Sequence, residues 1–243
     1  MTPSPSRRRG PWIRATGLIL LSVLAGLLAW QAMTWPHVAA MALRPPPTTA
    51  FIERHVERER AAGRSGAVAW TWTPLSRMSR SLPLAVLVSE DDTFFDHGGF
   101  AIAQIRAAIT TALAKRERPR GASTITQQLA KNLWLSPSRN PWRKAKETLL
   151  TIQLEQDLEK RRILELYLNV AEFGRGIYGA EAASRHYFGK SASALTDGEA
   201  AQLAASLPKP SAWHPGSTSR AWQARTRIIL DRMQRSRWLL GRL

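Results

Sequence analysis

Cysteine is absent from all 243 residues of this chain. The chain therefore has no disulfide framework, and thiol catalysis and Cys-ligated metals are excluded. Histidine is also scarce, and the five histidines are scattered at positions 37, 55, 97, 186 and 214. They form no evident metal-binding motif, so the sequence predicts no metal site.

Acidic residues are few as well, with 18 Asp and Glu against 35 Lys and Arg, so the formal net charge is +17. The first 35 residues contribute four arginines and no acid. The remainder of the chain therefore keeps a formal charge of +13. Such an excess suits nucleic acid, anionic lipid head groups or a phosphorylated substrate.

A long apolar run near the N-terminus provides the first topological prediction. Residues 15–35 hold no charge and follow a basic segment at 1–14, and this length can span a bilayer core of about 30 Å. A cleaved signal peptide shares the basic start, but its apolar region is typically only about 7–15 residues long. Trp30 and Trp35 also suit an interfacial belt, which favours an uncleaved anchor. The positive-inside rule then keeps residues 1–14 cytoplasmic and places the rest on the outer, periplasmic face, where nucleic acid is the least suitable partner.

Beyond the anchor, residues 36–48 contain three consecutive prolines and predict a stiff linker. Residues 49–243 are enough for one domain with a substantial core. Residues 67–74 alternate like a short strand, whereas most later segments have helical patterns. These helices are expected near 49–62, 82–90, 101–115, 123–135, 142–158, 160–170, 178–187, 196–206 and 218–238. The fold class is therefore predicted to be mainly α behind a single membrane helix.

The segment Gly121 to Asn132 places uncharged polar residues on one helical face. If Ser123 is the N-cap, one side presents polar groups while Ile125 and Leu129 face the core. A plain solvated face is the alternative, but such faces usually alternate Glu with Lys. The polar side, predicted to line a site, consists of Thr124, Gln127, Gln128 and Lys131.

Two clusters of charged residues are further candidates. Glu90 and Asp91 follow a wholly apolar segment and precede a glycine-rich turn, where a half-buried carboxyl group can act as a general base or acid. These acids could also simply cap and solvate a helix end. Arg143 and Lys144 lie four and three residues before Glu147, which is compatible with ordinary helix ion pairs. Together with cations on a second helix, they could instead clamp a pyrophosphate.

Four blocks, in this order and spacing, make the chain resemble the peptidoglycan glycosyltransferases, glycosyltransferase family 51. They are SEDDTFFDHGGF, GASTITQQLAKNLWL, RKAKETLLTIQLE and RILELYLNVAEFGRGIYGAEAASRHYFGKSA. The resemblance runs from about residue 65 to residue 213. The stand-alone form of the family, the monofunctional biosynthetic transglycosylases, fits best because no penicillin-binding domain follows.

The resemblance implies a lysozyme-like helical fold and the polymerisation of lipid II at the outer leaflet. Glu90 aligns with the catalytic base, which takes the proton from the 4-hydroxyl of the acceptor N-acetylglucosamine. Undecaprenyl pyrophosphate leaves and the configuration at the sugar carbon inverts. Glu147 matches the second family glutamate, which orders its neighbouring cations or orients the donor. The remaining matches are Asp91, Phe94 and His97 in the first block, Ser123, Thr124, Gln127, Gln128 and Asn132 in the cleft block, and Lys131, Arg143 and Lys144 as cations for the leaving group.

Several expectations about partners follow from the same resemblance. Lipid II, the growing lipid-linked glycan and the membrane are the expected partners, other cell-wall synthases are candidates, and no nucleic acid is expected. No cofactor is required, although Mg²⁺ or Mn²⁺ could bridge the substrate pyrophosphate, because such ions neutralise substrate phosphates elsewhere.

The chain departs from the family pattern at one position, and two alternative functions stay open. The family usually has an aspartate after the phenylalanine that ends the first block, whereas this chain has Ala101. In the family this carboxylate is expected to order the start of the next helix, so activity should survive its loss. A lytic transglycosylase would share the fold and a glutamate but would need no cations for a pyrophosphate. A non-catalytic cell-wall scaffold is supported only by Ala101.

Overall fold

The computed structural model describes residues 11–115, 123–138 and 140–243. The chain divides into two compact units, Met1–His37 and Val38–Leu243. In the first unit, helix α1 spans Pro11–Met33. By length and composition, Thr16–Ala42 is the one candidate membrane span among the described residues, as the apolar run predicts. Residues 1–10 of the predicted basic segment, and Gly121 and Ala122 of the polar block, lie outside the described residues.

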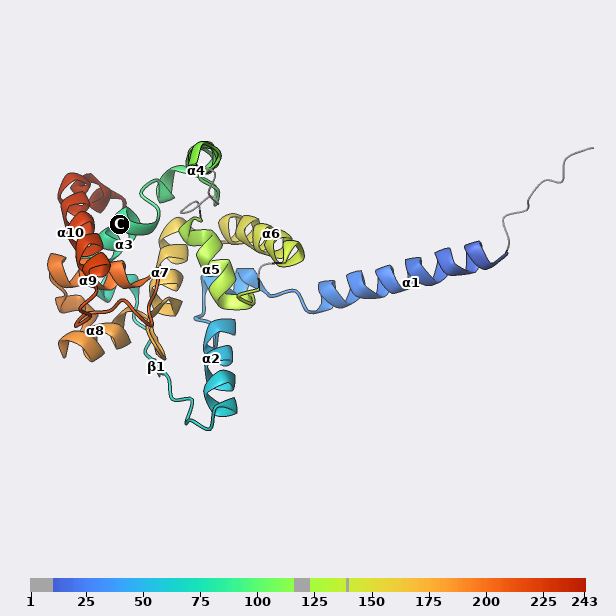
Figure 1. Ribbon diagram of the computed structural model, residues 1–243, viewed down its shortest axis with the longest axis horizontal. Helices are drawn as coiled ribbons and strands as arrows, with labels where there is room; N and C mark the ends of the chain where they lie inside the picture. Colours follow the sequence, from blue (N-terminus) through green and yellow to red (C-terminus); the bar gives the residue numbers. More distant parts are fainter. Residues whose placement is uncertain (1–10, 116–122, 139) are drawn as a thin grey trace, which may run out of the picture. The chain divides into compact units, whose positions relative to one another are not determined.

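The second unit is mainly α-helical, as expected from the sequence (Figure 1). Most of the predicted helices are present within a few residues of their expected ends. Their bounds are α2 Ala50–Ala61, α3 Ser81–Glu90, α4 Ile102–Lys115, α5 Ile125–Trp134, α6 Pro141–Asp157, α7 Lys160–Val170, α8 Ala180–Phe188, α9 Asp197–Ser206 and α10 Arg220–Arg235. Short 3-10 helices occur at η1 Val38–Ala42, η2 Leu75–Arg77, η3 Phe94–Asp96, η4 Ala192–Ala194 and η5 Arg237–Arg242.

A small sheet of three short strands departs from the sequence prediction. Strand β1 covers Ala69–Trp70, where a longer strand was expected, and β2 and β3 cover Glu172–Gly174 and Ile177–Tyr178. The order is β1-β3-β2, with β3 parallel to β1 and antiparallel to β2. The last two strands are too short to show an alternating pattern. Gly179 has a φ of 80° and precedes α8, which delays the helix beyond its predicted start because only glycine adopts this conformation readily.

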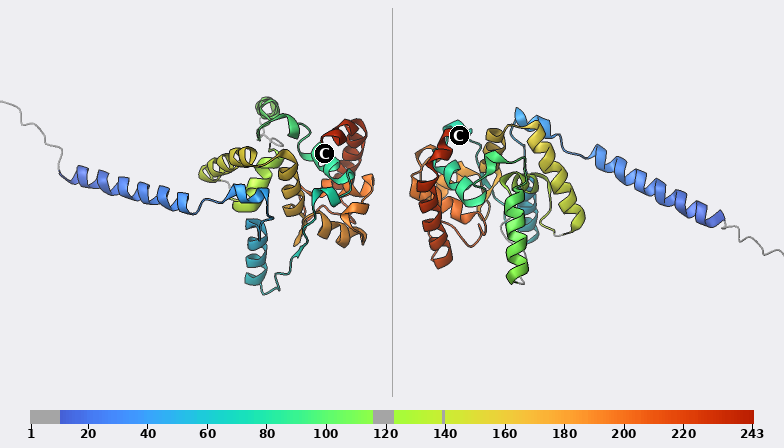
Figure 2. Two further views of the ribbon diagram at one scale, coloured as in Figure 1. Left: turned by 180° about the vertical axis from the view of Figure 1, so that it is seen from behind. Right: turned by 90° about the horizontal axis from the view of Figure 1, so that it is seen from above.

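Two groups of helices meet across α7, as the views in Figure 2 show. Helices α3, α9 and α10 pack together on one side, and α5 packs against α2, α6 and α7 on the other. The first group buries the whole apolar segment 82–88 of α3. Because α3 is enclosed, its C-terminal residue Glu90 has a fixed position between the two groups.

The segment predicted as a linker contributes to the second unit. Val38 is fully buried, η1 packs against α6, and Arg162 Nε donates a hydrogen bond to Met41 O at 2.7 Å. The compact unit therefore begins at Val38, before the prolines from which the boundary at residue 49 was predicted.

Candidate active site

Helix α3 brings Glu90 to the centre of the site. The buried apolar run anchors the helix, which ends at Glu90, and Asp91 leaves the helical conformation as the C-cap. A carboxylate at a helix C-terminus faces the negative end of the helix dipole. Glu90 therefore needs external hydrogen-bond donors, and its side chain remains only 12% exposed.

Three donors hold the Glu90 carboxylate. Oε1 accepts hydrogen bonds from Arg225 Nη2 of α10 at 2.9 Å and from Ser89 Oγ at 3.0 Å. Oε2 accepts one from Gln128 Nε2 of α5 at 3.0 Å. Each carboxylate oxygen can accept about two hydrogen bonds. Oε2 therefore has remaining acceptor capacity, and it is the oxygen that can receive a proton from a bound hydroxyl.

Tyr167 fixes the orientation of the Gln128 amide. Its hydroxyl donates to Gln128 Oε1 at 2.9 Å, so the amide nitrogen is the end that faces Glu90. Burial raises the pKa of Tyr167 well above its ordinary value, and the nearby Glu90 charge adds to the effect. The tyrosine hydroxyl consequently stays protonated and remains a donor.

Asp91 connects the first sequence block to the N-terminus of α5. Its carboxylate is buried, and it accepts hydrogen bonds from Ile125 N at 3.0 Å and from His97 Nε2 at 3.0 Å. His97, a match to the first family block, therefore has a structural contact with Asp91. Phe94 is fully buried. Asp91 and Phe94 are thus buried against other parts of the protein, although both were predicted to bind substrate.

The predicted cap of α5 is wrong by one residue. Thr124, not Ser123, is the N-cap, and it forms a capping box with Gln127. The Thr124 hydroxyl also donates to Gly99 O at 2.7 Å. Both side chains are buried and use their polar groups within the protein. Serine and threonine are both favoured N-caps, but only Thr124 is followed three residues later by a glutamine that can complete a capping box. Ser123 is exposed.

Gly99 allows this close approach of the first block to α6. Its φ is 90°, and a Cβ atom there would lie 2.8 Å from Thr151 Cγ2. Any other residue would therefore displace the turn that accepts the Thr124 hydrogen bond.

The remaining polar residues of α5 face a pocket. Gln128, Lys131 and Asn132 line it together with residues of α2, α7 and the β2–β3 hairpin. Burial lowers the pKa of Lys131, while the negative charges of Glu147 and Glu90 raise it. Among the described residues, Lys131 has no salt-bridge partner within 4.0 Å, which leaves a half-buried cation available to an anionic ligand.

Helix α6 presents the third predicted cluster. Asn140 caps it and Pro141 occupies its first turn, a position where proline is favoured. Glu147, 4% exposed, pairs with Arg143 Nη1 at 2.5 Å and with Lys144 Nζ. The i,i+4 and i,i+3 pairing expected from the spacing is thus confirmed. Arg143 Nε is buried without a hydrogen-bond partner in the described structure, so one donor of this cluster is still available.

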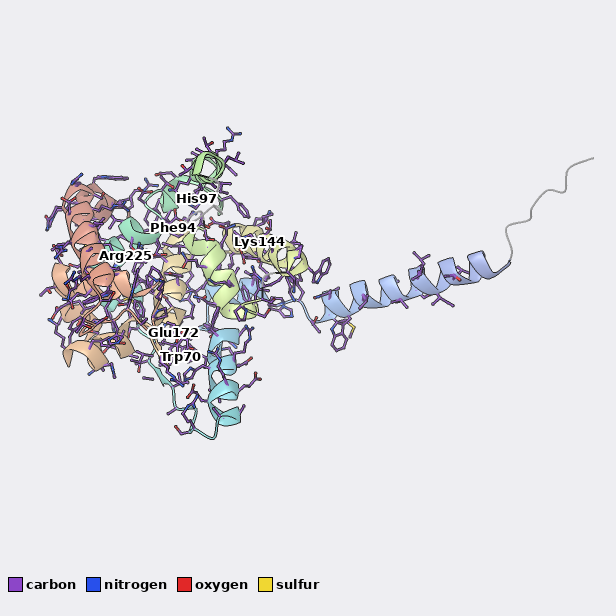
Figure 3. The ribbon with its side chains drawn as sticks, in the orientation of Figure 1. Trp70, Phe94, His97, Lys144, Glu172 and Arg225 are labelled. Carbon is purple, nitrogen blue, oxygen red and sulfur yellow. The ribbon has the colours of Figure 1, made fainter. Side chains whose placement is uncertain are left out.

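The structure therefore brings the three predicted clusters of polar and charged residues together. Lys131 is close enough to Glu90 and to the Arg143, Lys144 and Glu147 cluster for each to shift its pKa. In Figure 3, Lys144 marks the α6 side of the site and Arg225 the α10 side. The Glu90 carboxylate and a group of cations hence lie within one electrostatic environment.

Sequence reasoning missed Arg225 and gave Tyr167 no role. Arg225 is one of five arginines in α10, and its contact with Glu90 spans 135 residues of chain. No local spacing separates it from its neighbours. Tyr167 lies in the fourth block, and its burial among apolar residues with a polar hydroxyl was the available signal. In the described residues, no three His, Cys, Asp or Glu side chains gather as metal ligands.

The chain is similar to known proteins over most of its length. Residues 58–234 match the family described as Transglycosylase. The chain is 42% identical over 233 residues to the biosynthetic peptidoglycan transglycosylase of Bordetella avium, covering 94% of this chain and 97% of the relative. It is 42% identical over 216 residues to the protein of the same name in Thiobacillus denitrificans, covering 89% and 93%. It is 45% identical over 197 residues to that of Azoarcus sp. strain BH72, covering 81% and 85%. The chain belongs to the transglycosylase family.

Proposed function

We propose that this enzyme polymerises lipid II into glycan strands, with Glu90 as the general base. The observation that carries the proposal is the double role of Gln128. Its amide donates to Glu90 Oε2, and the same side chain lines the pocket that contains Lys131. Gln128 therefore connects the proposed base, Glu90, with Lys131, the proposed cation for the leaving group.

In the proposed reaction, the 4-hydroxyl of the acceptor N-acetylglucosamine donates its proton to Glu90 Oε2. The hydroxyl oxygen forms a bond to C1 of the donor N-acetylmuramic acid while the bond from C1 to the pyrophosphate oxygen breaks. The electron pair of that bond remains on undecaprenyl pyrophosphate, and the α-linkage becomes β. A single displacement of this kind needs one base on the side of the nucleophile.

The leaving group needs positive charge more than an acid. Arg143 and Lys144 carry two positive charges against the one negative charge of Glu147, and Lys131 adds a further cation. The excess of about two charges suits the charge that develops on a pyrophosphate. Glu147 orders the two α6 cations in this scheme, so it acts on the donor through them.

The other predicted site residues divide into two sets. Asp91, Phe94, Thr124 and Gln127 hold the backbone that carries Glu90 and α5, since their side chains are buried. Gln128, Asn132 and the exposed Ser123 remain available for direct substrate contact.

The proposal also assigns a membrane topology. Helix α1 is compatible with a single anchor, and the arginines of residues 1–14 would keep that segment cytoplasmic. The catalytic unit then acts at the outer face, where lipid II and other cell-wall synthases are accessible. Protease added to intact spheroplasts should degrade the unit from Val38 onward, whereas its protection would contradict this orientation.

We further propose that any divalent ion is held by the substrate pyrophosphate and not by a protein site. Mg²⁺ or Mn²⁺ commonly binds through substrate phosphates with few protein ligands. Chelation with EDTA should slow turnover and added Mg²⁺ should restore it, whereas unchanged turnover would remove the ion from the scheme.

Incubation of the full-length protein with labelled lipid II in detergent tests the proposal. Polymeric glycan released from undecaprenyl pyrophosphate is the expected product. A lytic transglycosylase would instead shorten added glycan strands, and a scaffold would leave both substrates unchanged.

A further inference from the structure

The pocket lined by Gln128 contains an acidic residue other than Glu90. Its volume is about 200 Å³, and its lining includes Lys131 at one position and Glu172 at another. Glu172 is the single acidic residue in this lining, and it has no role in the scheme above. Figure 3 labels Glu172 beside Trp70, at the small sheet.

A glutamate at position 172 is energetically unfavourable, because its carboxyl group is partly buried in the pocket lining. It stands in β2 opposite Tyr178, and in the described part of the chain no Lys or Arg nitrogen lies within 4.0 Å of it. Burial raises its pKa, while the Arg58 charge and the N–H of Gly176 lower it. A partly buried carboxyl group without an ion pair costs stability. Such a group in a pocket is more often retained for binding than for folding.

Lys131 and Glu172 give the two parts of the pocket different ligand preferences. Lys131 attracts phosphate, whereas the Glu172 carboxylate repels it and accepts hydrogen bonds from hydroxyl or amide N–H groups. A ligand with a pyrophosphate at one end and a hexosamine next to it has the matching order of groups.

We propose that Glu172 is a specificity-determining residue that accepts hydrogen bonds from the hydroxyl or amide groups of a lipid II hexosamine while the adjacent pyrophosphate lies at Lys131. This inference rests on the proposed function and deepens it. Glu172 contributes to recognition of the sugar and has no part in the proton transfer at Glu90.

Binding measurements separate the sugar from the pyrophosphate. The full-length Glu90→Gln protein serves as the parent because it should bind without turnover. Its affinity for lipid II and for undecaprenyl pyrophosphate, which lacks both sugars, is measured in detergent with and without Glu172→Ala. We expect Glu172→Ala to weaken lipid II binding about tenfold or more, the scale of a hydrogen bond to a charged group. Affinity for undecaprenyl pyrophosphate should stay within about twofold.

Two further variants serve as controls. Glu57→Ala removes an exposed carboxylate from neighbouring α2 and should change neither affinity. Lys131→Ala should weaken the binding of both ligands. Glu172→Gln keeps the size of the side chain, so it preserves the test if the alanine variant unfolds, and it should also weaken lipid II binding selectively.

The possible results have distinct meanings. Unchanged lipid II affinity, or an equal loss for both ligands, would overturn the role of Glu172 while leaving the proposed function intact. If the folded parent binds neither ligand, the proposed function fails and the inference fails with it. Thermal unfolding of every variant distinguishes lost binding from lost structure.

Discussion

The base side and the cation side of the site are built in opposite ways. The proposed base side, made by α3, α9 and α10, buries segment 82–88 of α3 and holds Glu90 through Arg225, which lies 135 residues away in the sequence. The cation side, made by α5 and α6, pairs Arg143 and Lys144 with Glu147 within one turn of helix. Its helix α6 leaves large apolar side chains such as Leu149 exposed, in that case by 55%.

This difference matches the demands of the two tasks. A base must present one oxygen to one hydroxyl, so small displacements reduce the rate of proton transfer. Packing on all sides restricts such displacement. Cations that neutralise a pyrophosphate act over longer distances, and a local cluster on one helix is sufficient for them.

Removing the base should have the largest effect. Glu90→Gln keeps the size and polarity of the side chain but cannot accept the proton, so lipid II polymerisation should fall by about 10²–10⁴-fold. Lipid II binding and thermal stability should be nearly unchanged. Asp92→Asn, at an exposed acid two residues further on, is the control. More than about a hundredth of wild-type activity in the Glu90 variant would contradict the base assignment.

Truncating one leucine on each side tests the packing contrast. Leu87→Ala in fully buried α3 should lower the free energy of unfolding by about 2–5 kcal/mol. Leu149→Ala on α6 should change it by less than about 0.5 kcal/mol, since exposed positions contribute little. Chemical denaturation measures both values. Equal losses would show that the outer face of α6 around Leu149 is packed as tightly as the core position Leu87.

Removing single cations should slow turnover by an intermediate amount. A charge-assisted hydrogen bond contributes about 1.5–3 kcal/mol, so Lys131→Ala, Arg143→Ala and Lys144→Ala should each reduce the rate roughly ten- to a hundredfold with little loss of thermal stability. Arg235→Ala, which removes an exposed ion pair with Asp231, should leave turnover unchanged. Wild-type kinetics for Lys131→Ala would remove the pyrophosphate clamp.

The smallest effect is expected at Ala101. Helix α4 begins at Ile102, and Ala101 O accepts the hydrogen bond from Ile105 N, so Ala101 occupies the N-cap position. Ala101→Asp would supply a capping oxygen there, a gain of about 0.5–2 kcal/mol at exposed caps that burial of the new carboxylate would reduce. Turnover should be equal or higher, and thermal unfolding should shift slightly upward. A large fall in turnover would mean that the chain has repacked around alanine.

The sequence predicted the cation side better than the base side, and the reason is the range of the contacts. Helical spacing alone placed Arg143, Lys144 and Glu147 on one face, and the resemblance supplied the lysozyme-like helical fold. The capping use of Gln127 is also a local pattern that is readable in the sequence, but the prediction of Ser123 as the cap missed it. Spacing contains no information on tertiary packing, so the contact of Arg225 with Glu90 could not be derived. The same limit hid the short strand that carries Glu172, whose place in a pocket depends on a hairpin of only a few residues.

The contact between Arg225 and Glu90 also affects the order in which the enzyme becomes competent. Because α10 is the last α-helix of the chain, a growing polypeptide holds the complete Glu90 residue long before its guanidinium partner has been synthesised. Until α10 docks, Oε1 lacks its strongest donor and α3 lacks part of its cover. A product truncated before α10 would thus retain all four sequence blocks and still lack the Arg225 donor to Glu90 Oε1.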